Sequence, residues 1–342
     1  MDALSDVLRA VRLTGATFFD VQASEPWVAE TPPGPSIVGQ IFPGADHLIP
    51  YHALTRGSCW GGLLDEAPLR LAAGDVIVFP HGDPHVLSSA PGMRNPPDLS
   101  LYRRPTDGQL PFSLSVGGPS LDAAGDASSA RRGDGSDGTG LVCGYLACDA
   151  RPFNPLLAAL PAVIRVSERE GGAIGAFLAF AVEESREARI GGECVLGRLS
   201  ELMFVDVVRR YLETLPADRT GWLAGLRDPF VGKALAALHA SPARDWTLES
   251  LGREVGLSRS ALAERFTQFV GQPPMQYLAS WRMQLAANHL RSGTESVAEV
   301  ATLVGYESEA AFSRAFKRAV GTAPGRWRDR PERSVSSPSP QG

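Results

Sequence analysis

The last third of the chain contains an internal repeat, and this repeat constrains the fold more than any other feature of the sequence. Five positions of one copy recur in the other at a displacement of 50 residues: Leu262, Phe266, Gly271, Pro274 and Tyr277 correspond to Phe312, Phe316, Gly321, Pro324 and Trp327. The first two positions of each copy are four residues apart, which is the spacing of one buried helix face. The repeat therefore predicts one helical unit built twice.

Each copy has the signals of two helices joined by a tight turn. The first helix is expected over 248–255 in one copy and 297–304 in the other, followed by a glycine that can adopt a left-handed conformation. The second helix is expected to begin at Ser258 in the first copy and at Glu307 or Ser308 in the second. This is the helix-turn-helix pattern, whose second helix can enter a DNA major groove. The alternative is an ordinary helical bundle with duplicated hairpins.

The uneven distribution of charge favours DNA binding over that alternative. The net charge is −5, but residues 1–229 carry 19 Lys and Arg against 28 Asp and Glu, whereas residues 230–330 carry 13 against 9. Such asymmetry suggests one basic module. The outward faces of the two second helices present the residues that we predict to contact double-stranded DNA: Ser258, Arg259, Ser260 and Arg265 in the first copy, and Ser308, Glu309, Ser313, Arg314, Lys317 and Arg318 in the second.

The segment 228–328 closely resembles the DNA-binding domain of the AraC/XylS family of bacterial transcription regulators. The motifs that carry the resemblance are WTLESLGREVGLSRSALAERF, GQPPMQYLASWRMQLAANHLR and VAEVATLVGYESEAAFSRAFKRAVGTAPGRWR. The resemblance implies seven helices, with a long helix over about 274–290, and an activator that binds a promoter site and works with RNA polymerase. Glu307 and Glu309 are a departure, since acidic groups there can cap the helix, accept from cytosine or repel phosphate.

The first part of the chain has the signals of an all-β module. Short apolar runs between turn residues predict strands over 36–42, 48–54, 59–64 and 76–79. The stretch LRLAAGDVIVFPHGDPHVL, 69–87, resembles the second conserved box of cupin β-barrels, with a Pro-Gly turn that directs His85 inward. The resemblance implies an α+β chain in which a cupin-like β-barrel sensor domain precedes helices and an all-α C-terminal domain with two helix-turn-helix motifs.

Three histidines of the β module are candidate effector residues: His52, His81 and His85. Imidazoles can bind a metal ion, but the usual first cupin box has His-x-His and a following Glu, and here His52 stands between Tyr51 and Ala53. We therefore expect no metal and no cofactor, and a protein that is not an enzyme. A metal-dependent cupin enzyme fused to a DNA-binding domain is the alternative.

Two cysteines are candidate redox residues. CGYLAC places Cys143 and Cys148 on opposite faces of an expected strand, so they are badly placed to bond each other. The N-terminal half also resembles a reactive-chlorine-responsive subgroup of the same family, and the match to Cys143 is direct. The effector is thus either an oxidant sensed by thiols or a small molecule held in the barrel.

Composition and periodicity predict the boundaries. The sensor domain is expected over 1–150, with a disordered loop at 117–140. A helical region at 151–215 follows, and its apolar stripe is either intradomain core or a homodimer face. We expect a linker at 216–229, the DNA-binding domain at 230–328 and a disordered tail at 329–342. The lack of a signal-peptide pattern and of a long apolar run predicts a cytoplasmic, nucleoid-associated protein without membrane contact.

Overall fold

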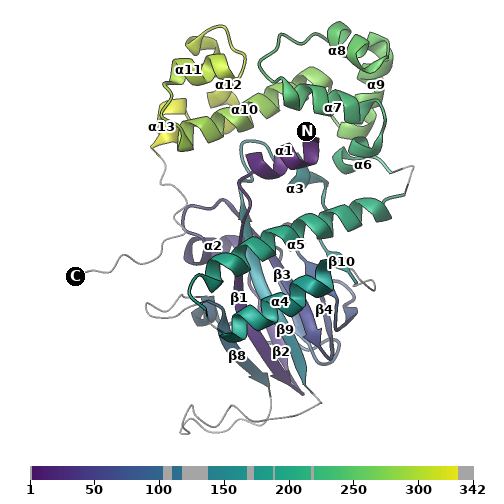
Figure 1. Cartoon of the computed structure of the whole chain (residues 1–342), viewed down its shortest axis with the longest axis vertical. Helices are drawn as coiled ribbons and strands as arrows, with labels where there is room; N and C mark the ends of the chain where they lie inside the picture. Colours follow the sequence, from purple (N-terminus) through teal and green to yellow (C-terminus); the bar gives the residue numbers. More distant parts are fainter. Residues whose placement is uncertain are drawn as a thin grey trace, which may run out of the picture.

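The protein has a sheet-rich half and a helical half. The computed structural model describes residues 2–102, 110–117, 138–167, 173–187, 189–216 and 219–329. The sheets and the helices α4 and α5 occupy the lower part of Figure 1, and a group of helices that includes α7 to α13 occupies the upper part. The predicted α+β class is confirmed. The predicted loop, apart from its ends, and the predicted tail from residue 330 onward lie outside the described residues.

The N-terminal half contains two sheets. The larger has the order β10-β6-β3-β9-β1-β8, and its strands are β1 (Thr14–Ser24), β3 (His47–Arg56), β6 (Val76–Val78), β8 (Phe112–Gly117), β9 (Thr139–Cys148) and β10 (Ile164–Val166). The smaller has the order β2-β7-β4-β5, and its strands are β2 (Val28–Thr31), β4 (Ser58–Leu63), β5 (Leu69–Ala72) and β7 (His85–Ser88). Apolar side chains from both sheets form one core between them, including Phe19, Ile77 and Cys143 from the larger sheet and Leu71 and Leu87 from the smaller.

The two sheets do not close into the barrel implied by the cupin resemblance. Within the described part of the chain, no strand of one sheet pairs with a strand of the other, so each sheet keeps two edge strands. The strands at the edges give the physical reason. The larger sheet ends in β8 with 6 residues and β10 with 3, and the smaller sheet ends in β2 and β5 with 4 each, so the edges are too short to pair with each other and close a barrel. The domain is an open two-layer arrangement with a gap between its sheets.

One predicted strand is a helix. Residues 36–42 have β-branched and aromatic side chains, but most of them belong to α2 (Gly34–Ile41). Pro35 lies in the first turn of this helix, where its missing N–H is not needed. Ile37 is fully buried in the core between the sheets. The strand prediction was wrong because helix-start chemistry and packing outweigh β propensity.

Two helices cover the outer face of the larger sheet, α4 (Ala173–Glu187) and α5 (Gly192–Thr214) (Figure 1). α5 crosses β1 so closely that a Cβ added at Gly15 would lie 2.5 Å from the carbonyl oxygen of Gly197. The apolar stripe of α5 is core, since Leu196, Met203 and Val207 are buried there. β9 is therefore covered on both faces, and Cys143 and Cys148 lie in different cores, which confirms their predicted opposite directions.

The remaining helices form the upper part of the molecule or lie beneath it. Four of them flank the sheets and the predicted linker: α1 (Ala3–Ala10), the 3-10 helix η1 (Leu99–Tyr102), α3 (Pro155–Ala159) and α6 (Trp222–Arg227). The seven helices implied by the resemblance follow: α7 (Val231–Ala240), α8 (Leu248–Val255), α9 (Arg259–Val270), α10 (Pro274–Ser292), α11 (Val297–Leu303), α12 (Glu309–Val320) and α13 (Pro324–Arg328). The long helix α10 joins two helix-turn-helix units, α8–α9 and α11–α12.

The two units have the predicted local structure. Gly256 ends α8 with a φ of 80°, and Gly305 follows α11 with a φ of 83°. Ser258 caps α9 by accepting from the N–H of Ala261, and Ser308 caps α12 by accepting from Ala311. The cap of the second unit is therefore Ser308 and not Glu307.

The two units belong to different cores. Leu262 and Phe266 of α9 are part of a continuous cluster that reaches through α7 and α1 to the outer face of the larger sheet. Phe312 and Phe316 of α12 pack in a separate cluster with Trp327 and one end of α10. Within the described residues, no helix is long and apolar enough to cross a membrane.

Candidate DNA-binding surface and sensor pocket

The second helix of the second unit presents exposed cations. Arg314, Lys317 and Arg318 of α12 are exposed, and none of them has an ion pair among the described residues. Ser313 on the same helix is half-buried, and Glu309 is exposed in its first turn, where a negative charge favours the helix N-terminus. The surface of α12 can therefore offer positive charge to a phosphate backbone.

The second helix of the first unit has its arginines engaged. Arg259 pairs with Glu249 of α8 at 3.0 Å, although both side chains are largely exposed. Arg265 holds Asp228 with two nitrogens: Nε lies 3.0 Å from both carboxylate oxygens, and Nη2 lies 2.5 Å from Oδ2. Ser258 is occupied as a cap, and Ser260 is exposed. The two units thus differ in how much of their charge is free.

Asp228 anchors the first unit. Its side chain is only 4% exposed, and it also accepts from the N–H groups of Phe230 and Val231 at the start of α7. Burial opposes ionisation, but the hydrogen bonds from Arg265 and from the two backbone groups hold the pKa of Asp228 below its ordinary value. Arg265 is therefore a link between α9 and α7, and its assignment to a DNA base stays a prediction.

A buried charge cluster joins the two halves of the molecule. Asp149, just after β9, is fully buried and accepts from Arg12 Nε at 2.8 Å and from Arg291 Nη2 at 3.2 Å. Arg291 lies on α10, has a 3% exposed side chain and stacks over Trp327 at 4.7 Å. Each charge has an opposite partner, which is the condition for keeping charges in a protein interior.

Amide side chains of α10 extend this contact. Gln284 and Asn288 both donate to the carbonyl oxygen of Ala10, at 2.9 and 2.6 Å, and Gln284 accepts from the N–H of Phe153 at 3.0 Å. With Arg291 they lie four and three residues apart on one helix face. The sequence analysis missed these residues, although their spacing places them on one face of the predicted long helix. We call Arg12, Asp149, Gln284, Asn288 and Arg291 the interdomain cluster.

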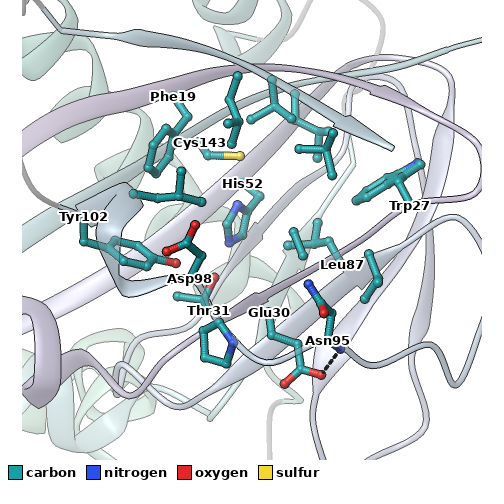
Figure 2. Close-up of a pocket in the computed structure, with 18 of the residues that line it drawn as sticks. Phe19, Trp27, Glu30, Thr31, His52, Leu87, Asn95, Asp98, Tyr102 and Cys143 are labelled. Carbon is teal, nitrogen blue, oxygen red and sulfur yellow. Dashed lines mark hydrogen bonds between the residues drawn. The ribbon is translucent and has the colours of Figure 1, made fainter. Parts of the chain in front are cut away.

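A pocket of about 350 Å³ lies between the two sheets. Its walls are mainly apolar and aromatic, and they come from β1, β2, β8, β9 and η1. Figure 2 shows His52 in the middle of the pocket, with Trp27 on one side and Tyr102 and Phe19 on the other. Cys143 lies on the wall formed by β9. Such a cavity has the size and character of a small-molecule site.

Only some of the predicted effector residues meet there. His52 and Cys143 line the pocket, and His85 lies behind His52, with 2.8 Å between their Nε2 atoms. His81 instead contacts the carbonyl oxygen of Leu160 at 3.0 Å, and Cys148 lies in the other core. Tyr102, Tyr145 and Trp27 were missed as lining residues, although the alternation of strands β1 and β9 points the neighbours of Cys143 to the same side.

The surroundings of the histidines and thiols oppose charge. Burial lowers the pKa of His85 to about 4 and the pKa of His52 well below its ordinary value. Burial also raises the pKa of the Cys143 thiol, and raises the pKa of the Cys59 thiol to about 12. Reactive cysteines need thiolate character, which burial opposes at Cys143. No group of three or more His, Cys, Asp or Glu suited to a metal ion occurs in the described part of the chain.

Comparisons with known proteins agree with both halves of this picture. A family model described as cupin matches residues 2–213, and one described as helix-turn-helix domain matches residues 251–330. The chain is 32% identical over 335 residues to an AraC-like transcription regulator of Streptomyces lividans, which covers 97% of this chain and 99% of the relative.

Two further proteins share part of the chain. The RCS-specific transcriptional activator RclR of Escherichia coli is 29% identical over 201 residues, 57% of this chain and 69% of its own. A solved structure of the DNA-binding domain of AdpA in complex with a target DNA is 29% identical, has a TM-score of 0.29, and covers 30% of this chain and 90% of that one.

Proposed function

Because the chain belongs to the AraC-like transcription regulators and carries a cupin domain at its N-terminal end, we propose that a small molecule in the pocket between the sheets changes how the C-terminal domain binds promoter DNA. The chain is a DNA-binding regulator, as predicted, and its relatives are named as regulators and not as enzymes. The effector and its route to the DNA-binding helices are the proposal.

One observation carries the proposal. Strand β9 supplies Leu141, Cys143 and Tyr145 to the pocket wall, and the residue directly after β9 is Asp149, the centre of the interdomain cluster. A ligand that shifts β9 therefore acts on the residue that holds α10. Coupling between distant sites needs such a contiguous element with two arrangements, each favoured by a different ligand.

The same arrangement supports a mode of DNA binding. We propose that α9 and α12 enter successive major grooves, with Arg314, Lys317 and Arg318 on α12 near phosphates. The cations of α12 have no ion pair among the described residues, which leaves them available. Arg259 must leave Glu249 to reach a base, and its exposed position makes that exchange inexpensive.

An unidentified effector need not be known to test the coupling. Leu114 lies on the edge strand β8 and lines the pocket, whereas the neighbouring Ser113 is exposed on the other face of the strand. Leu114→Trp should fill the pocket, and Ser113→Trp is the matched control. With a duplex selected from a random pool, Leu114→Trp should change DNA affinity at least roughly threefold, by about 0.7 kcal/mol. Equal affinities of both variants and the parent protein would contradict the coupling.

A small molecule is a better candidate effector than an oxidant. RclR is named for RCS, but in this chain the Cys143 thiol is buried and its pKa is raised by that burial. Cys143→Ser should therefore leave the response to mild hypochlorite, if there is one, unchanged. A footprint shift that depends on Cys143 would restore the oxidant hypothesis.

We also propose that the protein activates transcription at the nucleoid with RNA polymerase, as a homodimer. Support for the dimer comes from exposed apolar side chains on the outer helices, Leu202 at 59% and Val195 at 38% on α5, and Phe180 at 42% on α4. Sedimentation of the parent protein and of Leu202→Glu tests the dimer, and transcription in vitro with purified polymerase tests activation.

A further inference from the structure

The polar atoms around His52 fix which of its nitrogens is left to accept a hydrogen bond. The Nδ1 atom of His85 lies 2.8 Å from the carbonyl oxygen of Asp83, which can only accept, so His85 carries its proton on Nδ1. In a neutral ring the Nε2 of His85 then accepts, and His52 must donate to it from its own Nε2. The Nδ1 of His52 is left as an acceptor, and it is buried with no partner among the described residues.

The acidic groups at the pocket differ in how they are neutralised. Glu30 is held by Arg94, with Nε at 2.5 Å and Nη2 at 3.2 Å, and by the N–H of Asn95. Asp98 accepts only from the N–H and hydroxyl of Ser100, at 2.9 and 2.7 Å, and it has no ion pair among the described residues. Hydrogen bonds from the Ser100 hydroxyl and N–H hold the pKa of Asp98 below its ordinary value, so it is ionised at neutral pH.

Asp98 is directed at the pocket and not away from it. Figure 2 shows its carboxylate between Tyr102 and His52, and Asp98 lines the pocket although it is an exposed residue. Trp27 stands apart from this group on the other side, and its indole N–H also has no partner in the described part of the chain. No Lys or Arg among the described residues lines the pocket.

These features of the pocket indicate the charge of the ligand that it would bind. The two free polar groups near Tyr102, His52 Nδ1 and Asp98, both accept hydrogen bonds, so they call for a donor. Aromatic side chains, Phe19, Trp27, Tyr102 and Tyr145, provide the faces that attract a cation. A carboxylate ligand would be desolvated there without an opposite charge, which is costly.

We infer that the pocket binds a hydrophobic cation, an apolar molecule with one protonated amine whose N–H groups point to Asp98 and His52. The inference rests on the proposed function, because it assigns the chemical class of the effector to the same pocket. The apolar body of the ligand lies against the walls formed by β1, β8 and β9.

Three probes with one skeleton test the charge preference in the full-length protein: 4-butylbenzylamine, 4-butylbenzyl alcohol and 4-butylbenzoate. By calorimetry, the amine should bind roughly fivefold tighter than the alcohol. The benzoate should bind at least about tenfold more weakly than the alcohol. The advantage of the amine should shrink as salt rises, because the charge pair is near the surface. Equal binding of amine and alcohol, or tightest binding of the benzoate, would overturn the inference.

Two exposed carboxylates provide matched variants. Asp98→Asn should bring the ratio of amine to alcohol affinity to about one, and it is not expected to disturb folding, since Asp98 is exposed. Glu66→Gln, an exposed carboxylate that does not line the pocket, should leave the ratio unchanged. A ratio that survives Asp98→Asn would refute the role of Asp98. Nitrogen NMR of the parent protein provides a check without variants, since a proton on His52 Nδ1 would contradict the assigned acceptor.

Failure of this inference is distinguishable from failure of the proposed function. If the amine binds in an Asp98-dependent way and leaves DNA affinity unchanged, the ligand class stands and the proposed sensing fails. If Leu114→Trp changes DNA affinity but the amine shows no preference over the alcohol, sensing stands and the ligand class is refuted.

Discussion

The two helix-turn-helix units have the same local design and different surroundings. In both, a serine caps the second helix, a left-handed glycine lies in the turn, and two apolar side chains four residues apart face inward. The first unit shares a core with the sensor half, and the two arginines of its second helix form ion pairs with Asp228 and Glu249. The second unit has its own core, and the cations on its second helix have no ion pair among the described residues.

The difference suggests a division of work between the copies. A unit that is continuous with the sensor core is the one whose position the sensor can change, because packed cores transmit displacement. A unit with its own core and free cations is suited to hold the DNA backbone regardless of sequence. The two copies therefore have the same local fold, but their different contacts suit them to different roles.

Deleting one aromatic ring from each core should have the largest effect and tests whether the two cores are separate. Phe266→Ala and Phe316→Ala should each cost about 3–5 kcal/mol of local stability, since both rings are fully buried. Native-state hydrogen exchange should show loss of protection in both halves for Phe266→Ala. Phe316→Ala should affect amides of α11–α13 and of the C-terminal end of α10. Matching exchange patterns in the two variants would mean that the cores are not separate.

Acid should weaken the first unit before the second. His239 of α7 is buried between Tyr277 and Trp281, and burial lowers its pKa to about 3. In the unfolded chain, His239 takes up a proton below its ordinary pKa of about 6.5, whereas in the folded protein it stays neutral. The free energy of unfolding is therefore at its full value above pH 6.5 and decreases as the pH falls toward the folded pKa, by about 3 kcal/mol at pH 4.

Denaturant unfolding at pH 7 and pH 4 measures the loss. His52 and His85 act in the same direction, because burial lowers their pKa values too. His239→Phe isolates the share of the first unit and should reduce the pH dependence. An unchanged pH dependence in this variant would show that His239 is not a source of the acid sensitivity.

The arginines of α9 offer a finer test. Arg259→Ala should weaken binding to a selected site by about 1–3 kcal/mol and relax the preference at one base pair, if it reads a base. Arg265→Ala also removes the contact with Asp228. We therefore expect this variant to have a lower free energy of unfolding and to bind all DNA sequences more weakly to the same extent. Selection from a random pool compares the two variants, and a narrow loss of specificity in Arg265→Ala would make it the base reader instead.

Substitution of Lys317 should produce the smallest change in DNA affinity. Lys317→Ala should weaken all DNA sequences alike by about 0.5–1 kcal/mol and reduce the slope of log affinity against log salt by about one. The measurement is a salt titration of binding, with Lys233 on α7 as a lysine outside the predicted surface. A sequence-dependent loss would show that Lys317 touches a base.

The sequence predicted the C-terminal half better than the N-terminal half, and the reason is locality. Ser258, Ser308 and the glycines after α8 and α11 act within four residues of their own position, so pattern alone reveals them. The seven C-terminal helices were implied by the family resemblance, and the structure has them. The predicted strand over 36–42 was wrong because the burial of Ile37 and Phe42 depends on contacts with the sheets, which are distant in the sequence.

Long-range contacts explain what the sequence could not show. Asp149 and Arg291 are 142 residues apart, and nothing near either one identifies its partner. His52 and Cys143 were singled out by the family resemblances, but the pocket also needs Trp27 and Tyr102 from segments without a motif. The predicted closure of the barrel was wrong because it depends on which strands lie at the edges of the two sheets, and the apolar pattern of a strand does not show this.

The single carboxylate of Asp149 has a consequence for exchanging domains between related proteins. Arg12 comes from the N-terminal segment and Arg291 from the DNA-binding domain, and both pair with this one side chain, while Arg291 also lies 3.7 Å from Asp46. A chimera that joins this sensor to another DNA-binding domain must bring an arginine at the position of Arg291, or it buries a charge without its full complement. The sensor, the residue after β9 and α10 are therefore one inheritable module, and the practical cut point for recombination lies beyond α10.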